Sequence, residues 1–159
     1  MLIQFKQILV SLFMASSMQT PINLDVMNDT ACMAQAIFKE AANQSLAGKL
    51  AVGNVIQNRS ESKLYPNKVC EVVYQKGQFQ YTKNRIPKLK ESDDKVYKQM
   101  VDSTKAALMI MNNEVPDNTH GATSFVNLKI ATHTDWLKSM KKTVMIGEHT
   151  FYRSRKDMI

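Results

Sequence analysis

The stretch from Asp29 to Arg59 most constrains the fold, because it reads as two helices joined by a short polar connection. Asp29 or Thr30 can cap the first helix by accepting from its free N–H groups. The second helix follows Ser45 and is apolar around most of its circumference, which is typical of a buried helix. In the first helix the apolar residues recur at helical spacing and share one face, namely Met33, Ala36, Ile37 and Ala41.

Glu40 is unusual because it falls among the apolar residues of that face. Burying a charge without a partner is costly, so such a carboxyl keeps its proton more readily and its pKa is expected to rise. A carboxyl that is protonated near neutral pH can act as a general acid when an ether oxygen must leave. The alternative is that Glu40, at the helix end, bends its side chain toward water or toward Lys39.

The N-terminal part of the chain divides into two segments before a single domain at residues 29–159. Residues 1–17 carry one basic residue, Lys6, followed by an apolar run and small residues, which is typical of a short secretory signal. This segment is too short to span a membrane, and the alternative is an amphipathic helix packed on the domain. Residues 18–28 read as a linker, because Pro21 argues against continuous helix.

The net charge of +7 indicates an anionic partner. Nucleic acid, phospholipid and an anionic bacterial cell wall all meet that requirement. The basic residues are spread along the chain, and the sequence contains no arginine-rich tract and no aromatic-basic RNA motif. Nucleic acid is therefore not predicted as the partner.

The two cysteines, Cys32 and Cys70, permit one disulfide and no zinc finger. A bridge across this loop is worth about 3–4 kcal/mol in chain-entropy models, and it persists only in an oxidising compartment. The alternative is a pair of buried free thiols. The sequence leaves both open.

The second half of the chain predicts one long helix followed by short strands. Ser92-Asp93-Asp94 is a helix start, and the amphipathic pattern that follows ends before Pro116. Residues 122–126 read as a strand, and Trp136 is expected to anchor in the core. Gly147-Glu148 separates two further β segments, and glycine at the first position of a two-residue turn predicts a type II′ hairpin. The chain is thus expected to adopt a mainly helical α+β fold with a small C-terminal β-hairpin.

Several segments taken together resemble the SleB-type cell wall hydrolase family, which is found in spore-cortex-lytic enzymes and in bacteriophage lysis proteins. The matching text is IFKEA at 37–41, LAVGNVIQNR at 50–59, YPNKVCEVVYQKGQF at 65–79, GATSFVN at 121–127, Trp136, and IGEHTFYR at 146–153. The resemblance implies a lysozyme-like catalytic domain that cleaves the β-1,4 bond between N-acetylmuramic acid and N-acetylglucosamine. It also implies an enzyme exported to the periplasm or cell wall, or released from the host cell if phage-encoded.

The resemblance implies that Glu40 is the catalytic acid. Other positions match family motifs beside the cleft and are expected to bind the glycan: Asn58, Gln78, Phe79, Asn127, His149 and Tyr152. We expect the amides among them to bond sugar amides and the rings of Phe79 and Tyr152 to stack on sugars. The chain also departs from the family. Members commonly continue E-A-R-G-E, whereas Glu40-Ala41 is followed here by Ala42-Asn43-Gln44.

The sequence does not single out a second catalytic carboxylate, although four acids are candidates: Glu71, Asp117, Asp135 and Glu148. One acid is sufficient for a lytic transglycosylase. Glu40 would protonate the leaving oxygen and then take the proton of the sugar 6-hydroxyl, which closes an anhydro ring. The alternative is an N-acetylmuramidase that hydrolyses the same bond. We expect a monomer that acts on the peptidoglycan glycan strand and has no cofactor, no metal and no stable membrane span.

Three other classes remain as alternatives. A cysteine hydrolase would pair one of the thiols with His120, His133 or His149, but neither cysteine has a recognised nucleophile context. A zinc amidase could use the same histidines, but the sequence contains no H-E-x-x-H spacing. A non-catalytic module that binds cell wall or nucleic acid explains the basic charge but not the acid on an apolar helix face.

Overall fold

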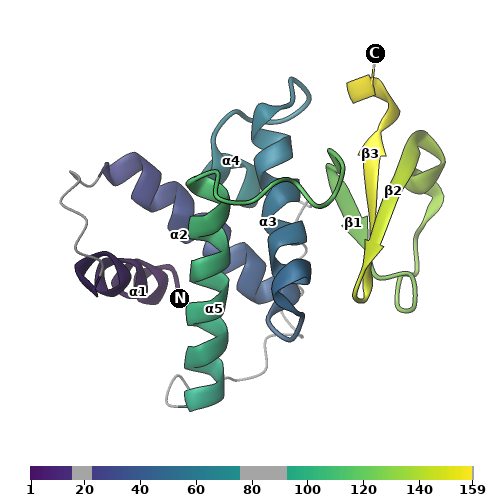
Figure 1. Cartoon of the computed structure of the whole chain (residues 1–159). Coiled ribbons are helices and arrows are strands. Elements are labelled where there is room, and N and C mark those ends of the chain that lie inside the picture. Colours follow the sequence, from purple (N-terminus) through teal and green to yellow (C-terminus); the bar gives the residue numbers. More distant parts are fainter. Residues whose placement is uncertain (16–22, 76–92, 159) are drawn as a thin grey trace.

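The computed structural model describes residues 1–15, 23–75 and 93–158 (Figure 1). The helices are α1 (Leu2–Ala15), α2 (Leu24–Ala41), α3 (Leu46–Glu61), α4 (Val69–Val73) and α5 (Asp94–Met111). The strands are β1 (Ser124–Val126), β2 (Met140–Ile146) and β3 (His149–Ser154), with 3-10 helices η1 (Asp135–Ser139) and η2 (Arg155–Met158). The chain is therefore a mainly helical α+β protein with a small sheet, as predicted.

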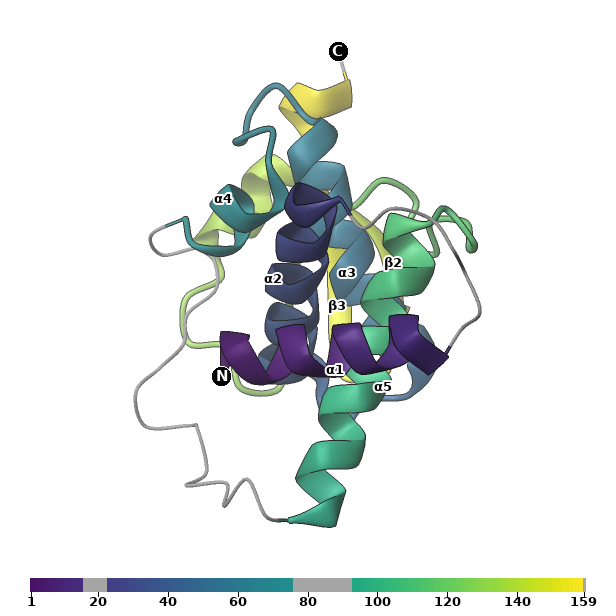
Figure 2. The ribbon, with the colours of Figure 1, turned by 90° about the vertical axis from the view of Figure 1, so that its left-hand side faces the viewer.

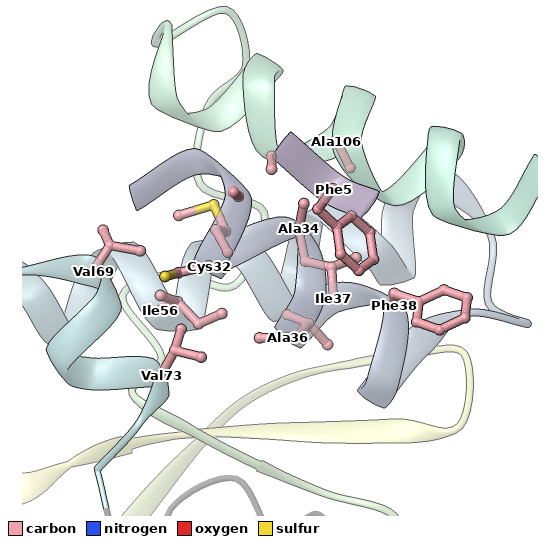
Figure 3. Packing of buried hydrophobic residues seen from close by; sticks show 14 of the residues in the cluster. Phe5, Cys32, Ala34, Ala36, Ile37, Phe38, Ile56, Val69, Val73 and Ala106 are labelled. Carbon is pink, nitrogen blue, oxygen red and sulfur yellow. The ribbon is translucent and has the colours of Figure 1, made fainter. Parts of the chain in front are cut away.

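Helix α2 lies at the centre of the helical part and contacts α1, α3, α4 and α5. Every residue from Thr30 to Phe38 is buried, because helices surround it on several sides. Figure 3 shows the side chains of Phe5, Ala34, Ile37 and Phe38 gathered between α1, α2 and α5. The two-helix core predicted from the sequence is confirmed.

Helix α2 begins earlier than predicted. Its N-cap is Asn23, whose side-chain oxygen accepts from Asp25 N at 2.9 Å, so the predicted caps Asp29 and Thr30 lie inside the helix. Thr30 instead donates its hydroxyl to the carbonyl of Val26 at 2.6 Å. Residues 24–28 of the predicted linker are therefore helical, because Asn23, two residues after Pro21, caps the helix.

Helix α1 packs across α2 and α5 (Figure 2). Its inner face is buried, with Phe5 and Leu9 fully covered and the rings of Phe5 and Phe38 5.8 Å apart. This arrangement matches the alternative given for residues 1–17, an amphipathic helix packed on the domain. The assignment of residues 1–17 as a signal stays a prediction. None of the described helices is long and apolar enough to cross a membrane.

A disulfide between Cys32 and Cys70 joins α2 to α4, with the two Cα atoms 5.3 Å apart. Of the two possibilities left open by the sequence, the structure contains the bridge. In Figure 3, Cys32 lies beside Val69, Ile56 and Val73, the apolar residues that α3 and α4 bring against α2.

The sheet is antiparallel with strand order β1-β3-β2, and it lies on the far side of α3 from α1 (Figure 1). Gly147 begins the β2–β3 turn with φ +58°, whereas Glu148 has no positive φ, which is the type II′ pattern that the sequence predicted. Phe151 packs with Ala51, Val55 and Ala122 in a small second core between α3 and the sheet.

Trp136 does not anchor in the core, contrary to the prediction. It lies in η1 with 40% of its surface exposed. Its indole N–H donates to the carbonyl of His133 at 3.1 Å, and its ring meets Tyr152 edge-on at 6.1 Å. The local bond satisfies its polar end, so the ring can remain at the surface.

Candidate active site

Glu40 occupies the last turn of α2 and is partly buried, while Ala36, Ile37 and Ala41 on the same face are fully buried. Loss of water around the carboxyl raises its pKa to about 7, and the nearby cations of Lys39 and Arg59 oppose that rise. At neutral pH both the protonated and the ionised form of the group are therefore populated. A carboxyl in this state can both give and take a proton.

Arg59 lies in the last turns of α3 and is 4% exposed. Its Nε donates to the carbonyl oxygen of Thr123 at 2.6 Å, and its guanidinium lies over the ring of Tyr65 at 5.1 Å. Burial lowers the pKa of Arg59, which Tyr65 and Glu40 partly offset. Arg59 therefore bonds Thr123, just before β1, and its charge also lowers the pKa of Glu40. The sequence matched this residue to a family position but assigned it no role.

Asn58 fastens the loop that precedes β1. Its amide nitrogen donates to Asp117 Oδ2 and to the carbonyl oxygen of Ala122, both at 2.9 Å. A third, longer contact from the same nitrogen reaches Thr119 Oγ1 at 3.4 Å, so the amide nitrogen is engaged within the protein. The predicted sugar bond from Asn58 stays untested, and the contacts in the structure are those of a loop anchor.

Asp117 is held by four hydrogen bonds, two from Thr119, one from Gly121 N and one from Asn58. Burial alone raises its pKa, but the bonds from Thr119, Asn58 and Gly121 outweigh burial and lower it overall. The carboxylate is therefore ionised and shapes the loop. Its oxygens are occupied inside the protein, so it is a poor candidate for a second catalytic acid.

Asn127 follows β1 and closes a local turn. Its side-chain oxygen accepts from Lys129 N at 3.0 Å, and its backbone carbonyl accepts from Ile130 and Ala131. The side chain is partly exposed. The amide nitrogen of Asn127 therefore remains the group that can serve its predicted role toward a sugar.

His149 and Tyr152 come from the same strand but lie on opposite faces of it, since strand side chains alternate. His149 is buried against Phe125, with ring centroids 5.0 Å apart, and faces the second core. Burial lowers its pKa, and Glu148 partly offsets this. Tyr152 meets Trp136 on the other face. His149 and Tyr152, which were both predicted to bind the glycan, therefore do not share one surface. Trp136 lies beside Tyr152.

Two predicted binding residues, Gln78 and Phe79, lie outside the described residues. A polar hollow of about 570 Å³ lies at the C-terminal end of α3 and is lined in part by Asn58, Thr123 and Arg153. Glu40 is not among the described residues that line it. The hollow is therefore distinct from the immediate surroundings of the candidate acid.

The structure also bears on the alternative chemistries. Both cysteines are in the disulfide and do not supply a thiol nucleophile. Within residues 1–15, 23–75 and 93–158, no group of three or more His, Cys, Asp or Glu side chains is arranged to hold a metal ion.

Comparison with known proteins identifies related chains. The family model described as Cell Wall Hydrolase matches residues 43–152. A spore cortex-lytic enzyme of Halalkalibacterium halodurans is 30% identical over 125 residues, which cover 78% of this chain and 34% of that protein. A spore cortex-lytic enzyme of Bacillus subtilis is 28% identical over 124 residues, covering 78% of this chain and 37% of that protein. The chain thus spans little more than a third of the length of these curated relatives.

Two solved structures have a similar fold. The catalytic domain of the Bacillus cereus SleB protein superposes with a TM-score of 0.57 at 23% identity, covering 87% of this chain and all of that one. The catalytic domain of the germination-specific lytic transglycosylase SleB from Bacillus anthracis gives a TM-score of 0.58 at 23% identity, covering 86% and 100%. These likenesses confirm the predicted lysozyme-like fold.

Proposed function

The chain belongs to the cell wall hydrolase family, and from this premise we propose that it is a lytic transglycosylase. Its substrate is the peptidoglycan glycan strand, cut at the β-1,4 bond between N-acetylmuramic acid and N-acetylglucosamine. The observation that carries the proposal is Glu40 at the end of α2, with a pKa raised to about 7. One residue then supplies both proton transfers.

In the first step, protonated Glu40 gives its proton to the glycosidic oxygen as the bond to the anomeric carbon breaks. The substrate's own N-acetyl oxygen stabilises the cation that develops. In the second step, the Glu40 carboxylate takes the proton of the 6-hydroxyl while that oxygen bonds to the anomeric carbon. The products are a free 4-hydroxyl and a 1,6-anhydro ring, and Glu40 ends protonated as it began.

Arg59 supports this cycle through its charge. A cation close to Glu40 stabilises the carboxylate that exists between the two steps and keeps the pKa of Glu40 from rising further. Without such a cation the pKa of Glu40 would rise further, and the carboxylate that the second step needs would form less readily. Arg59 is therefore a positioning and tuning residue, fixed by Thr123 and Tyr65.

A hydrolysing muramidase with two protein carboxylates would need a second acid across the sugar from Glu40. Of the four candidates, Asp117 is occupied by four hydrogen bonds, Asp135 pairs with Lys138 at 3.2 Å, and Glu148 bonds Gln44 at 3.1 Å. Glu71 is exposed on α4, the helix whose buried residues pack against α2 and α3. These assignments favour the single-acid scheme, and the muramidase is the alternative that the experiment below distinguishes.

Substrate contacts are proposed for residues that keep a free surface. The exposed ring of Trp136 can stack on a sugar ring, and Tyr152, which is only 8% exposed, supports it by an edge-on contact on the outer face of β3. Asn127 offers its amide nitrogen. Gln78 and Phe79 keep their predicted roles. We further propose an exported monomer that does not bind nucleic acid, and the Cys32–Cys70 bridge fits an oxidising compartment.

The test is mass spectrometry of the soluble fragments released from purified peptidoglycan. Wild type is expected to release fragments with anhydro-muramyl ends, and Glu40→Gln to lose activity by about a thousandfold. Glu71→Gln is the matched control, since it removes an exposed glutamate from another helix. Reducing muramic ends would assign hydrolysis instead. Wild-type cleavage by Glu40→Gln would exclude Glu40 as the acid, and no release by wild type would support the non-catalytic binding module.

A further inference from the structure

The connection between α2 and α3 is fastened to the β2–β3 turn by a single side chain, Gln44. Its amide nitrogen donates to Glu148 Oε2 at 3.1 Å, and its amide oxygen accepts from the backbone N–H of Glu148 at 3.3 Å. One side chain therefore makes two bonds of opposite polarity to one residue 104 positions away. An amide can do this, whereas a carboxylate can only accept.

The turn is shaped to admit this side chain. A Cβ at Gly147 would overlap the amide oxygen of Gln44, so any other residue there would displace the Gln44 side chain. The positive φ of Gly147 independently favours glycine. Gln44, Gly147 and Glu148 together are called the Gln44 clasp below.

Two further hydrogen bonds fix the backbone of Gln44 near the end of α2, which carries Glu40. The backbone N–H of Gln44 donates to the carbonyl of Ala41 at 3.0 Å, which continues from the last turn of α2. The ammonium of Lys49, a residue only 6% exposed, donates to the carbonyl of Gln44. Gln44 therefore has a defined position relative to Glu40, four residues before it.

We propose that Gln44 is a positioning residue for the reaction. The Gln44 clasp holds the β2–β3 hairpin, which carries Tyr152, at a fixed distance from the end of α2, which carries Glu40. This inference rests on the proposed function. The position is also one where this chain departs from the family pattern, because members commonly carry Glu where this chain has Gln44. A Glu at 44 would face the Glu148 carboxylate, whereas Gln44 pairs with it.

The test is a charge exchange across the clasp. Gln44→Glu sets two carboxylates against each other and is expected to lower kcat on peptidoglycan by about tenfold at pH 7, the order of one lost bond to a charged group. Glu148→Gln keeps an amide pair and is expected to stay within about twofold of wild type. The double variant Gln44→Glu/Glu148→Gln restores donor and acceptor in exchanged positions and is expected to recover most of the kcat.

Two readouts separate positioning from a general loss of stability. The kcat lost in Gln44→Glu should return in the double variant, and hydrogen exchange of the hairpin amides 150–152 should speed up in Gln44→Glu and return toward the wild-type rate in the double variant. Asn112→Asp is the matched control, because the exposed Asn112 donates to Glu114 at 3.4 Å in a surface amide–carboxylate pair after α5. It should change neither readout.

The outcomes distinguish the two proposals. If Glu40→Gln is inactive and Gln44→Glu keeps the wild-type kcat, the clasp proposal is overturned and the proposed function stands. A double variant as slow as Gln44→Glu also overturns the clasp. If wild type releases no fragments, the proposed function fails and the positioning role fails with it, while hydrogen exchange still decides whether the clasp holds the hairpin.

Discussion

The helical part of the molecule and its sheet are held by different forces. Around α2, the contacts are apolar and close-packed, with five helices contributing buried side chains. The sheet meets α3 through a much smaller apolar cluster around Phe151. Polar bonds supply the rest of that attachment, from Gln44, Asn54, Asn58 and Arg59. The difference indicates that the helical part supplies most of the stability, whereas polar contacts set where the sheet lies relative to Glu40.

The largest expected effect tests the helical part. Met33→Ala removes a fully buried side chain from α2 and should lower the free energy of unfolding by about 3 kcal/mol. Met145→Ala, at a position 65% exposed on β2, is the control and should change it by less than about 0.5 kcal/mol. Urea unfolding measures both. Equal losses of unfolding free energy in the two variants would contradict the conclusion that the helical part supplies most of the stability.

A second test of the helical part removes the disulfide that joins α2 to α4. Replacing Cys32 and Cys70 together by Ala should lower the free energy of unfolding by about 3 kcal/mol, because the unfolded chain gains freedom over the loop. A reducing agent should then lower the melting temperature of wild type but not that of the double variant. A wild-type melting temperature that does not respond to reduction would exclude a stabilising bridge.

The attachment of the sheet is tested at Arg59. Arg59→Gln removes the charged bond to Thr123 and should cost about 2 kcal/mol of stability. It also removes a cation that lowers the pKa of Glu40, so that pKa should rise. Under the proposed mechanism Glu40 must be protonated in the first step, so the loss of activity with increasing pH should move to higher pH. Arg155→Gln, an exposed charge in η2, is the control that should leave the profile unchanged.

The ionised Glu40 carboxyl lowers the stability of the folded protein, whereas the bond of Arg59 raises it. The pKa of Glu40 is about 7 in the folded protein and about 4.5 when unfolded, so the folded state binds the extra proton between these values. Stability therefore falls as pH rises from about 4.5 to 7, and Glu40→Gln should stabilise the protein by about 3 kcal/mol above pH 7 and little at pH 4. Thermal melts across this pH range measure the difference. A constant difference at all pH values would contradict the raised pKa.

The smallest expected effect concerns the outer face of the sheet. Trp136→Ala should leave stability within about 0.5 kcal/mol, since the ring is 40% exposed. If the ring stacks on sugars, KM for glycan strands should rise about fivefold, the value of one aromatic contact. Tyr97→Ala, which removes a 55% exposed ring from α5, is the matched control. The same KM in both variants would remove Trp136 from the binding surface.

The sequence predicted the site unevenly, and the reason is physical. Glu40 could be singled out as a candidate because helical spacing places it among apolar neighbours within its own helix, and its catalytic role stays a prediction. The anchoring contacts of Asn58 could not be predicted, since its partners Asp117 and Ala122 lie about sixty residues away. Trp136 was misplaced for a related reason. Its size favours burial, but a local bond to His133 satisfies its polar end at the surface.

The sequence by itself determined the features that depend on near neighbours along the chain: the α2–α3 pair, the start of α5 at Asp93, and the type II′ turn at Gly147. Only the tertiary structure decided the pairing of Cys32 with Cys70, the packing of α1, and the pKa of Glu40. Periodicity and turn conformation are set within a few residues. Desolvation and charge depend on segments such as α3 and the β2–β3 turn, which only folding brings to the end of α2.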